Sequence, residues 1–405
     1  MINPQVNRSS RRREEHRAEG LEASIHAELA SLQAAGLYRH TRRISGRPGP
    51  RMDVDGRGVL MLAGANYLDL AGDPRVIAAA NEAAARAGCA AGGSRLISGN
   101  LELHEQLEQD LADFTGRPAA LLFSTGYMAN LGVLTALAGP EDVIVSDALN
   151  HASIIDACRL SRAGTRVFRH NDPDDLQHVL RKLHGFRRRV LVLDGVYSMD
   201  GDVARLREIV PLAREHGMVT VLDDAHGLGV LGATGRGVAE SEGVTVDVQI
   251  GNLGKALGSF GAYVVGSRAL RELLVNRARS LIFTCGLPAA AAAAAREALH
   301  VLHAEPWRRR KLLARAAELR AGLRARGFDT GPSTTQIVPA LLGDAVRTMA
   351  ICERVLEQGV YVQGIRYPSV PRGSARLRFT PMCSHTRDDV EHALDVLAAA
   401  RDALP

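Results

Sequence analysis

Short apolar runs recur along the middle of the chain, each bounded by polar or turn-forming residues. The runs lie at residues 119–123, 143–146, 190–194, 218–222, 246–250 and 263–266. Most are separated by stretches with the three-to-four-residue spacing of an amphipathic helix, at residues 129–137, 153–162, 176–183 and 204–215. Buried strands that alternate with helices predict an α/β fold with a mostly parallel, doubly wound sheet.

The two ends of the chain have different patterns. Apolar residues spaced by three and four predict a helix over residues 13–37, after an arm at residues 1–12 that we expect to be disordered. Beyond Pro306 the chain predicts a long basic helix, then short strands mixed with two more helices. We therefore expect three parts: an N-terminal basic arm and helix, a large α/β domain and a smaller C-terminal α+β domain, at residues 1–56, 57–300 and 301–405.

Composition and charge exclude several classes of protein. With 46% hydrophobic and 23% charged residues, the 405-residue chain is neither disordered nor fibrous. Much of the net charge of +5 lies in the first 51 residues, but no aromatic residues interleave with those arginines, so we expect a solvated surface and no nucleic-acid partner. The longest apolar tract, 287–295, is far shorter than the ~20 residues of a membrane span, so we expect no membrane partner.

The cysteines indicate a reducing compartment. Five are scattered along the chain, and no two lie within 30 residues of each other, which excludes a zinc-ribbon spacing. An odd, dispersed set of cysteines and the lack of an apolar leader favour a cytoplasmic protein.

Polar residues that follow predicted strands are candidates for chemistry, because ligands of α/β proteins lie beyond the carboxyl ends of the strands. Asp223, Asp224 and His226 follow the run at 218–222. They suit acid–base work or a metal ion, but no third ligand lies nearby and we expect no metal. An aspartate at this position could also simply cap the next helix.

Lys255 lies in a glycine-rich turn after the run at 246–250. The turn is not a P-loop, because Gly251 and Gly254 are too close and Ala256 replaces the Ser or Thr that would hold magnesium. The alternatives are a surface lysine and an amine that attacks a carbonyl. The chain prefers arginine to lysine throughout, which favours the reactive amine. The nearby GxGxxG at 227–232 is followed by a poor helix, so we reject a dinucleotide-binding fold.

Two further loops complete a candidate binding site. Small residues at 124–130 open a helix, whose first N–H groups can bind an anion. His151 could stack on a planar ligand or cap a helix. A phosphate near residue 126, a carbonyl at Lys255 and a basic nitrogen at an aspartate together describe pyridoxal 5′-phosphate (PLP).

On these motifs the chain resembles the α-oxoamine synthases, a family of fold-type-I PLP-dependent transferases, from about residue 57 to the C-terminus. The matching segments are 92–95, 123–130, 150–153, 194–202, 223–227, 253–258 and 368–378. The resemblance implies a fold-type-I PLP transferase and a functional homodimer. Within the family, the chain looks most like the branch that makes 8-amino-7-oxononanoate for biotin.

The resemblance also implies roles for individual residues around the cofactor ring. Lys255 would bind PLP covalently through its amine, and Asp223 would keep the pyridine nitrogen protonated. His226 and Ser198 would lie at the phenolic oxygen, and His151 would stack on the ring.

Other residues would hold the phosphate and the substrate. Backbone N–H groups of Gly126 and Tyr127, with the side chain of Asn252, would bind the phosphate. Thr284 would reach the phosphate of the neighbouring subunit. Arg376 would bind the carboxylate of the amino acid, with a planar fork suited to that anion, and Asn66 would assist it.

The implied activity is the decarboxylative condensation of an amino acid, preferably L-alanine, with pimeloyl-CoA or an acyl-carrier-protein thioester. Two alternatives remain open: a glycine C-acetyltransferase (2-amino-3-ketobutyrate CoA ligase), and an α-oxoamine synthase of specialised metabolism. They stay open because the chain departs from the family pattern at Ala65 and Asn252, where relatives carry Asn and Thr.

Overall fold

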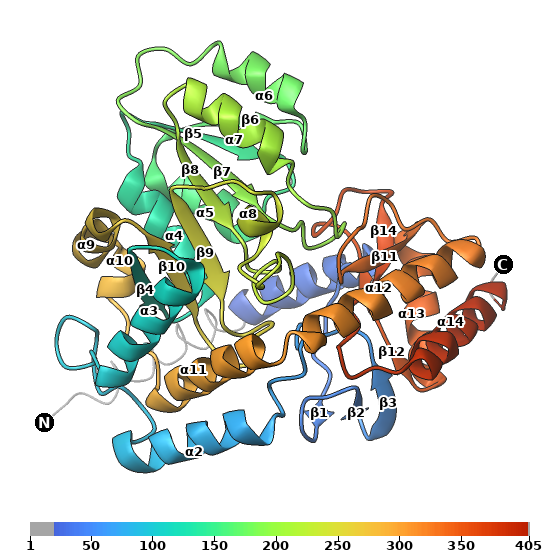
Figure 1. Ribbon diagram of the computed structural model, residues 1–405. Helices are drawn as coiled ribbons and strands as arrows, with labels where there is room; N and C mark the ends of the chain where they lie inside the picture. Colours follow the sequence, from blue (N-terminus) through green and yellow to red (C-terminus); the bar gives the residue numbers. More distant parts are fainter. Residues whose placement is uncertain (1–19, 404–405) are drawn as a thin grey trace, which may run out of the picture.

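The computed structural model describes residues 20–403, and a seven-stranded sheet forms the centre of its large lobe (Figure 1). The strand order is β4-β10-β9-β8-β7-β5-β6. The strands are β4 (Ala119–Phe123), β5 (Val143–Asp147), β6 (Gly164–Phe168), β7 (Arg189–Asp194), β8 (Val219–Asp223), β9 (Val248–Asn252) and β10 (Ala262–Gly266). The pairs from β6 to β9 are parallel, while β10 is antiparallel to both β9 and β4. The predicted mostly parallel sheet is confirmed.

Helices cover both faces of this sheet. Along β5, Val143 and Val145 pack in one apolar cluster, and Ile144 packs in another. Because successive side chains of a strand point to opposite faces, both faces are buried, as in a doubly wound fold. The helices of this lobe are α2 (Pro74–Ala87), α3 (Glu102–Thr115), α4 (Gly126–Leu137), α5 (Ala152–Ser161), α6 (Pro173–Leu180), α7 (Leu206–Glu215), α8 (Val238–Ser241), α9 (Arg268–Arg277), α10 (Arg279–Ile282) and α11 (Ala289–Ala304).

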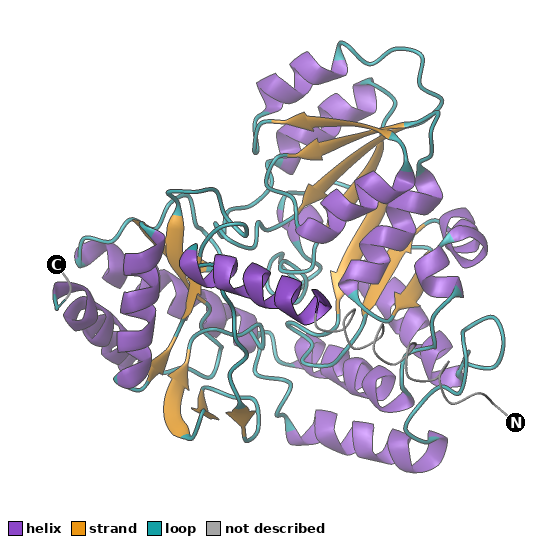
Figure 2. Cartoon of the chain, turned by 180° about the vertical axis from the view of Figure 1, so that it is seen from behind, coloured by secondary structure: helices purple, strands orange, loops and turns teal. Residues whose placement is uncertain are grey.

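The small lobe is an antiparallel sheet packed against helices, seen from behind in Figure 2. Its strands have the order β11-β14-β13 and are β11 (Val338–Gly343), β13 (Gln363–Ile365) and β14 (Ala375–Phe379). The helices are α12 (Trp307–Ala325), α13 (Ala345–Glu357) and α14 (Arg387–Asp402). Apolar residues from all three helices share one core with β11 and β14, so this lobe has its own hydrophobic centre.

A third sheet joins the start of the described chain to the small lobe. It consists of β1 (Ile44–Ser45), β2 (Arg51–Val54), β3 (Arg57–Met61) and β12 (Val360–Tyr361). β3 pairs in parallel with β12, and Leu60 and Leu62 pack in the core of the small lobe. The three-part division of the chain stays a prediction. The expected boundary at residue 57 does not match the packing, because β3, which begins there, packs with the C-terminal lobe and not with the large domain.

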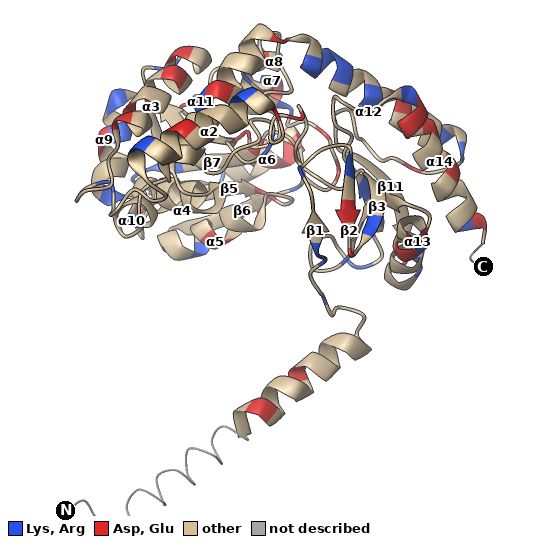
Figure 3. Cartoon of the chain, turned by 90° about the horizontal axis from the view of Figure 1, so that it is seen from below, with Lys and Arg blue, Asp and Glu red and all other residues tan. Residues whose placement is uncertain are grey.

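The helix predicted at 13–37 is described from residue 20, and its regular part ends at residue 34. Figure 3 shows it reaching away from the two lobes. Its apolar positions are exposed, with 61% of Leu21 and 41% of Ile25 accessible. The arm at 1–12, with its arginines, lies outside the described residues. No helix within residues 20–403 is long and apolar enough to cross a membrane.

The segment that enters β11 is fastened to a loop of the large lobe. The carbonyl of Gly201 accepts hydrogen bonds from Thr334 N (3.1 Å) and Thr335 Oγ1 (2.9 Å). Gly201 has φ of +71°, and an added Cβ would lie 2.0 Å from the carbonyl oxygen of Ile337. The contact between the lobes therefore depends on the absence of a side chain at position 201.

Replacement of Gly201 by alanine is expected to lower the free energy of unfolding by about 2–5 kcal/mol, through backbone strain and overpacking. Urea unfolding of the purified protein measures the loss. Gly217→Ala is the matched control: Gly217 has φ of +63° but nothing within 4 Å of its added Cβ. The control should lose only about 1 kcal/mol. Equal losses in both variants would contradict the importance of the Ile337 contact.

Candidate active site

Lys255 and His226 lie in contact beyond the carboxyl ends of β9 and β8. The Nζ atom of Lys255 is 3.0 Å from Nε2 of His226, and Nδ1 of His226 is 2.7 Å from the hydroxyl of Tyr67. A protonated Lys255 can only donate, so His226 then accepts at Nε2 and donates from Nδ1 to Tyr67. Tyr67 thereby fixes the tautomer and the direction of the imidazole.

The surroundings tune both groups towards their neutral forms. Burial lowers the pKa of Lys255 to about 8, with Asp223 and Asp194 opposing the shift and Arg378 adding to it. Burial also lowers the pKa of His226, and the positive charges of Lys255 and Arg378 lower it further. A lysine with a pKa of about 8 has roughly a tenth of its amine neutral at pH 7, which a nucleophile or base requires.

Asp223 is the last residue of β8 and Asp224 follows it, and the two carboxylates have different surroundings. Asp223 accepts hydrogen bonds from Asn130 Nδ2 (2.6 Å) and Ala225 N (3.0 Å), and its charge acts on Lys255. Asp224 is fully buried and accepts from Val238 N and Gln249 Nε2, both at 2.8 Å. Burial raises the pKa of Asp224 to about 7, although these hydrogen bonds oppose the shift. Asp224 therefore anchors the segment before α8, and Asp223 belongs to the site.

His151 is held at the start of α5 through its ring nitrogen Nδ1 and its backbone N–H. Its Nδ1 contacts Ser153 Oγ (2.7 Å) and accepts from Ser153 N (3.2 Å), which makes it the N-cap. Its backbone N donates to Asp194 Oδ2 at 3.0 Å. Burial lowers the pKa of His151, with the Asp223 charge opposing and Lys255 adding to the shift. His151 therefore caps α5, and its role against the ring of a cofactor stays a prediction.

The start of α4 has the form expected of an anion site. Thr125 caps the helix by accepting from Met128 N at 3.1 Å, which leaves the first N–H groups of the helix, at Gly126 and Tyr127, without this partner. A Cβ at Gly126 would lie 3.0 Å from Nδ2 of Asn252, so the amide of Asn252 is beside this helix end. The side chain of Tyr127 turns away and donates to Asp156 at 2.5 Å.

Two arginines of β14, Arg376 and Arg378, have different surroundings. Arg376 is 5% exposed, and its guanidinium binds Asp200 and the carbonyls of Met199 (3.2 Å) and Ser374 (3.1 Å). Arg378, two residues along β14, donates through Nε to the carbonyl of Ser198 at 2.6 Å. Its charge lowers the pKa of both Lys255 and His226. The role expected for Arg376 stays a prediction.

Two other expected residues have different outcomes. The carboxamide of Asn66 is used within its own turn: Nδ2 donates to Asp69, and Oδ1 accepts from Leu70 N and Ala71 N, each at 3.1 Å. Asn66 thus supports the loop of Tyr67, and its contact with a substrate stays a prediction. Thr284 lies in a surface segment beside Phe283, which is 70% exposed, so its role toward a neighbouring subunit stays a prediction.

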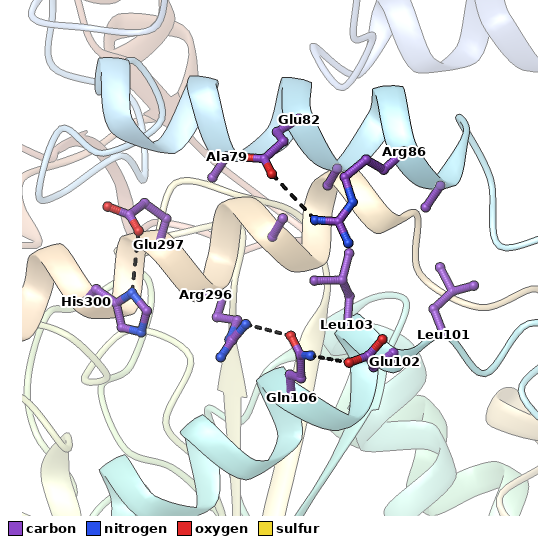
Figure 4. Close-up of a pocket in the computed structure, with 13 residues that line it drawn as sticks. Ala79, Glu82, Arg86, Leu101, Glu102, Leu103, Gln106, Arg296, Glu297 and His300 are labelled. Carbon is purple, nitrogen blue, oxygen red and sulfur yellow. Dashed lines mark hydrogen bonds and ion pairs between the residues drawn. The ribbon is translucent and has the colours of Figure 1, made fainter.

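A separate pocket of about 450 Å³ lies on the surface between α2, α3 and α11 (Figure 4). Arg296 lines it and donates to Gln106 Oε1 at 2.6 Å, while His300 faces Glu297 at 3.4 Å. It shares no lining residue with the site around Lys255. Among the described residues, no cluster of three or more His, Cys, Asp or Glu side chains could hold a metal ion.

The profile of the family described as aminotransferase class I and II matches residues 57–397. The chain belongs to this family. Within it, the chain is 50% identical over 379 residues to an 8-amino-7-oxononanoate synthase of Geobacter sulfurreducens, covering 93% of this chain and 97% of that one. An 8-amino-7-oxononanoate synthase of Symbiobacterium thermophilum is 45% identical over 374 residues, covering 92% and 95%.

Solved structures of this aminotransferase family agree with the fold. Serine palmitoyltransferase of Sphingomonas wittichii superposes with a TM-score of 0.89 at 35% identity, covering 94% of this chain and 97% of that one. The 8-amino-7-oxononanoate synthase of Francisella tularensis has a TM-score of 0.72 at 27% identity, covering 84% and 97%. Both are α-oxoamine synthases, so the predicted family and its fold-type-I architecture are confirmed.

Proposed function

We propose that the protein is a PLP-dependent acyltransferase that condenses L-alanine with a pimeloyl thioester and releases thiol and CO2, giving 8-amino-7-oxononanoate. The observation that carries the proposal is the buried Lys255, with its lowered pKa, in contact with His226 and under the charge of Asp223. The identity of about 50% to 8-amino-7-oxononanoate synthases over nearly the whole chain supports the substrates. Biotin synthesis in the cytoplasm is the matching cellular role.

The residues of the site fit PLP. A phosphate is matched by the α4 N-terminus with Asn252, a pyridine nitrogen by the carboxylate of Asp223, and an aldehyde by Lys255. Solved serine palmitoyltransferases with the same fold contain bound PLP. When bound, PLP supplies an electron-withdrawing ring that stabilises negative charge on the α-carbon of the amino acid.

The residues of the chain then divide the remaining work. Lys255, once its amine is free, removes the α-proton, and its pKa of about 8 keeps part of the amine neutral for this step. Asp223, fixed by Asn130, would hold a proton on the ring nitrogen. His226, fixed by Tyr67, is uncharged and would position Lys255 and the phenolic oxygen of PLP. We also place Ser198 near that oxygen.

The two ends of the substrate meet different residues. We assign the carboxylate of the amino acid to Arg378, since its charge acts on Lys255 and its guanidinium is held by the carbonyl of Ser198. His151, fixed by Ser153 and Asp194, faces the thioester carbonyl and stabilises the charge that develops on its oxygen.

The arginine assignment predicts a split between two variants. Arg378→Ala is expected to raise the KM for L-alanine about 10–100-fold, because a charged hydrogen bond contributes ~1.5–3 kcal/mol. Arg376→Ala should instead lower protein stability, since it leaves the partly buried carboxylate of Asp200 without its cation. Steady-state kinetics and thermal unfolding of both variants measure the split. A larger KM effect at Arg376 would restore the sequence-based assignment.

We also propose a homodimer as the functional unit. Three large side chains on the surface around the site, Tyr127, Phe260 and Phe283, are 45–70% exposed and would be covered by a second copy. Thr284, beside Phe283, would then lie near the phosphate of the partner. Sedimentation of the purified protein tests the dimer, and a monomer at micromolar concentration would contradict it.

The function is tested by absorbance and by product release. The purified protein with PLP should show a band near ~420 nm, and L-alanine with pimeloyl-CoA should release free thiol and CO2. Glycine with acetyl-CoA tests the C-acetyltransferase alternative, and pimeloyl-carrier protein tests the other donor. Thiol release only with glycine and acetyl-CoA would replace the proposal by that alternative. No thiol release with any pair would overturn the acyltransferase function.

A further inference from the structure

A histidine outside the cluster around Lys255 bridges two carboxylates at the β5–β6 edge of the large sheet. Nδ1 of His170 is 3.0 Å from Asp147 Oδ1, and its Nε2 is 3.0 Å from Asp202 Oδ2. The side chain of Asp147 is completely buried, and that of Asp202 is 9% exposed. The ring of Tyr197 meets the imidazole edge to face, with 4.3 Å between the ring centroids.

This geometry requires a protonated imidazole. Ionised carboxylates only accept hydrogen bonds, so both ring nitrogens must donate, and a neutral tautomer has a single donor. Burial favours the neutral ring, but the two carboxylates outweigh it and raise the pKa of His170 to about 10. The groups that contact the ring are Asp147 from β5, and Asp202 and Tyr197 from the segment after β7. The neighbouring Asn171 donates to both carboxylates. Burial and nearby carboxylates raise the pKa of Tyr197, so it is neutral.

On one side, His170 fixes the turn that leads to His151. Its partner Asp147 accepts from Leu149 N at 2.8 Å and from Asn171 N at 2.7 Å. Two residues later His151 N donates to Asp194 at 3.0 Å. A displaced Asp147 would release the start of this turn, which we call the β5–α5 turn (residues 147–151).

On the other side, His170 fixes the loop that carries the groups around Arg378. Its partner Asp202 accepts from Tyr197 N through its carbonyl at 3.1 Å, which closes the loop of residues 197–202. The carbonyl of Ser198 in this loop holds Arg378, and Asp200 holds Arg376. The imidazolium is thus the charged link between the β5–α5 turn and the 197–202 loop.

We propose that His170 is a positioning residue, whose partly buried positive charge (25% of the side chain is exposed) locks the β5–α5 turn to the 197–202 loop and so fixes His151 and Arg378 around Lys255. The inference rests on the proposed function for its catalytic consequence. The link itself concerns only residues of this chain. Without the cation, two buried carboxylates would face each other and push the two segments apart.

The protonation of His170 is tested first, on the apoprotein, by nitrogen NMR of histidine-labelled protein, with His170→Gln assigning the signal. Both ring nitrogens should remain protonated up to about pH 9. A folded-state pKa above the unfolded value near ~6.5 stabilises the fold most below pH ~6.5. That stabilisation should be lost progressively as the pH rises towards 10 in the native protein, and His170→Gln should not show this loss. Titration of His170 between pH 6 and 7 would overturn the proposal.

The catalytic consequence is tested on the PLP-loaded enzyme. His170→Gln is expected to reduce the circular dichroism of the bound cofactor and to lower kcat/KM for L-alanine about 10–100-fold, the effect of a small misplacement of reacting groups. Adding Asp202→Asn removes one of the facing charges and should recover most of both losses. His184→Gln, at an exposed position of the same lobe, is the matched control and should leave both values unchanged.

The outcomes separate this proposal from the proposed function. If the native protein binds no PLP, the proposed function fails, while the NMR and pH-stability measurements still decide the link. If the native protein turns over and His170→Gln matches it in dichroism and kinetics, the positioning role is overturned. If His170→Gln does not fold, the double variant with Asp202→Asn decides: a folded double variant supports the link, and an unfolded one overturns the charge argument.

Discussion

With alanine in place of Lys255, thiol release from pimeloyl-CoA and L-alanine is expected to fall about 10⁴-fold. The change removes both the amine that binds PLP and the base that takes the α-proton, and each of these functions contributes a large factor. The absorbance near ~420 nm should disappear even if PLP remains bound through its phosphate. Stopped-time thiol assays and an absorbance spectrum measure the two effects.

A lysine elsewhere on the chain provides the control. Lys182 is exposed at the end of α6, where its amine contacts His178 at 2.6 Å, and Lys182→Ala should keep the native rate and spectrum. Lys255→Arg should behave like the alanine variant, because a guanidinium keeps the charge but cannot serve as a neutral amine. A Lys255→Ala enzyme with more than a tenth of the native rate would exclude the lysine from the chemistry.

Asp223→Asn is expected to lower kcat about 10²–10³-fold, the size typical of removing one electrostatic contact to the developing charge. An asparagine can keep the hydrogen bond from Asn130, so the change is one of charge. The Asp223 carboxylate raises the pKa of Lys255, so its removal should lower that pKa below about 8. The acidic limb of the kcat/KM profile should therefore move to lower pH.

The exposed Asp174 in α6 supplies the comparison for this variant. Asp174→Asn also removes one negative charge, but far from Lys255, and should change neither the rate nor the pH profile. If Asp223→Asn loses activity while the acidic limb stays in place, Asp223 does not act on Lys255. A native rate would remove Asp223 from the site altogether.

The central strands could be predicted because they are buried on both faces. The run at 119–123 coincides with β4, and those at 190–194 and 143–146 differ from β7 and β5 by one residue. β6 was missed because it is the edge strand: of its five residues only Phe168 is buried, so no apolar run marks it. β9 extends to Asn252, beyond the predicted end at 250, because its last residues pair with β10.

Part of the candidate site could be predicted for a related reason. Asp223, His226, Lys255 and His151 directly follow strands or open helices, so local sequence places them at one edge of the sheet. Their catalytic roles remain proposals. The choice between Arg376 and Arg378 depends on Asp200, a partner 176 residues away in sequence, and no local pattern reports it.

The pairing of β3 with β12 sets an order of events during synthesis. Met61 and Tyr361 are partners in the same parallel ladder, although 300 residues separate them in the chain. At 5–20 residues per second, a ribosome needs roughly 15–60 s to make the intervening segment. Throughout that time Leu60 and Leu62 lack the core of the small lobe, which is made of later residues. β3 is thus made long before the strand and the core that bury it, so its apolar side chains stay exposed longer than those of strands whose partners are close in sequence.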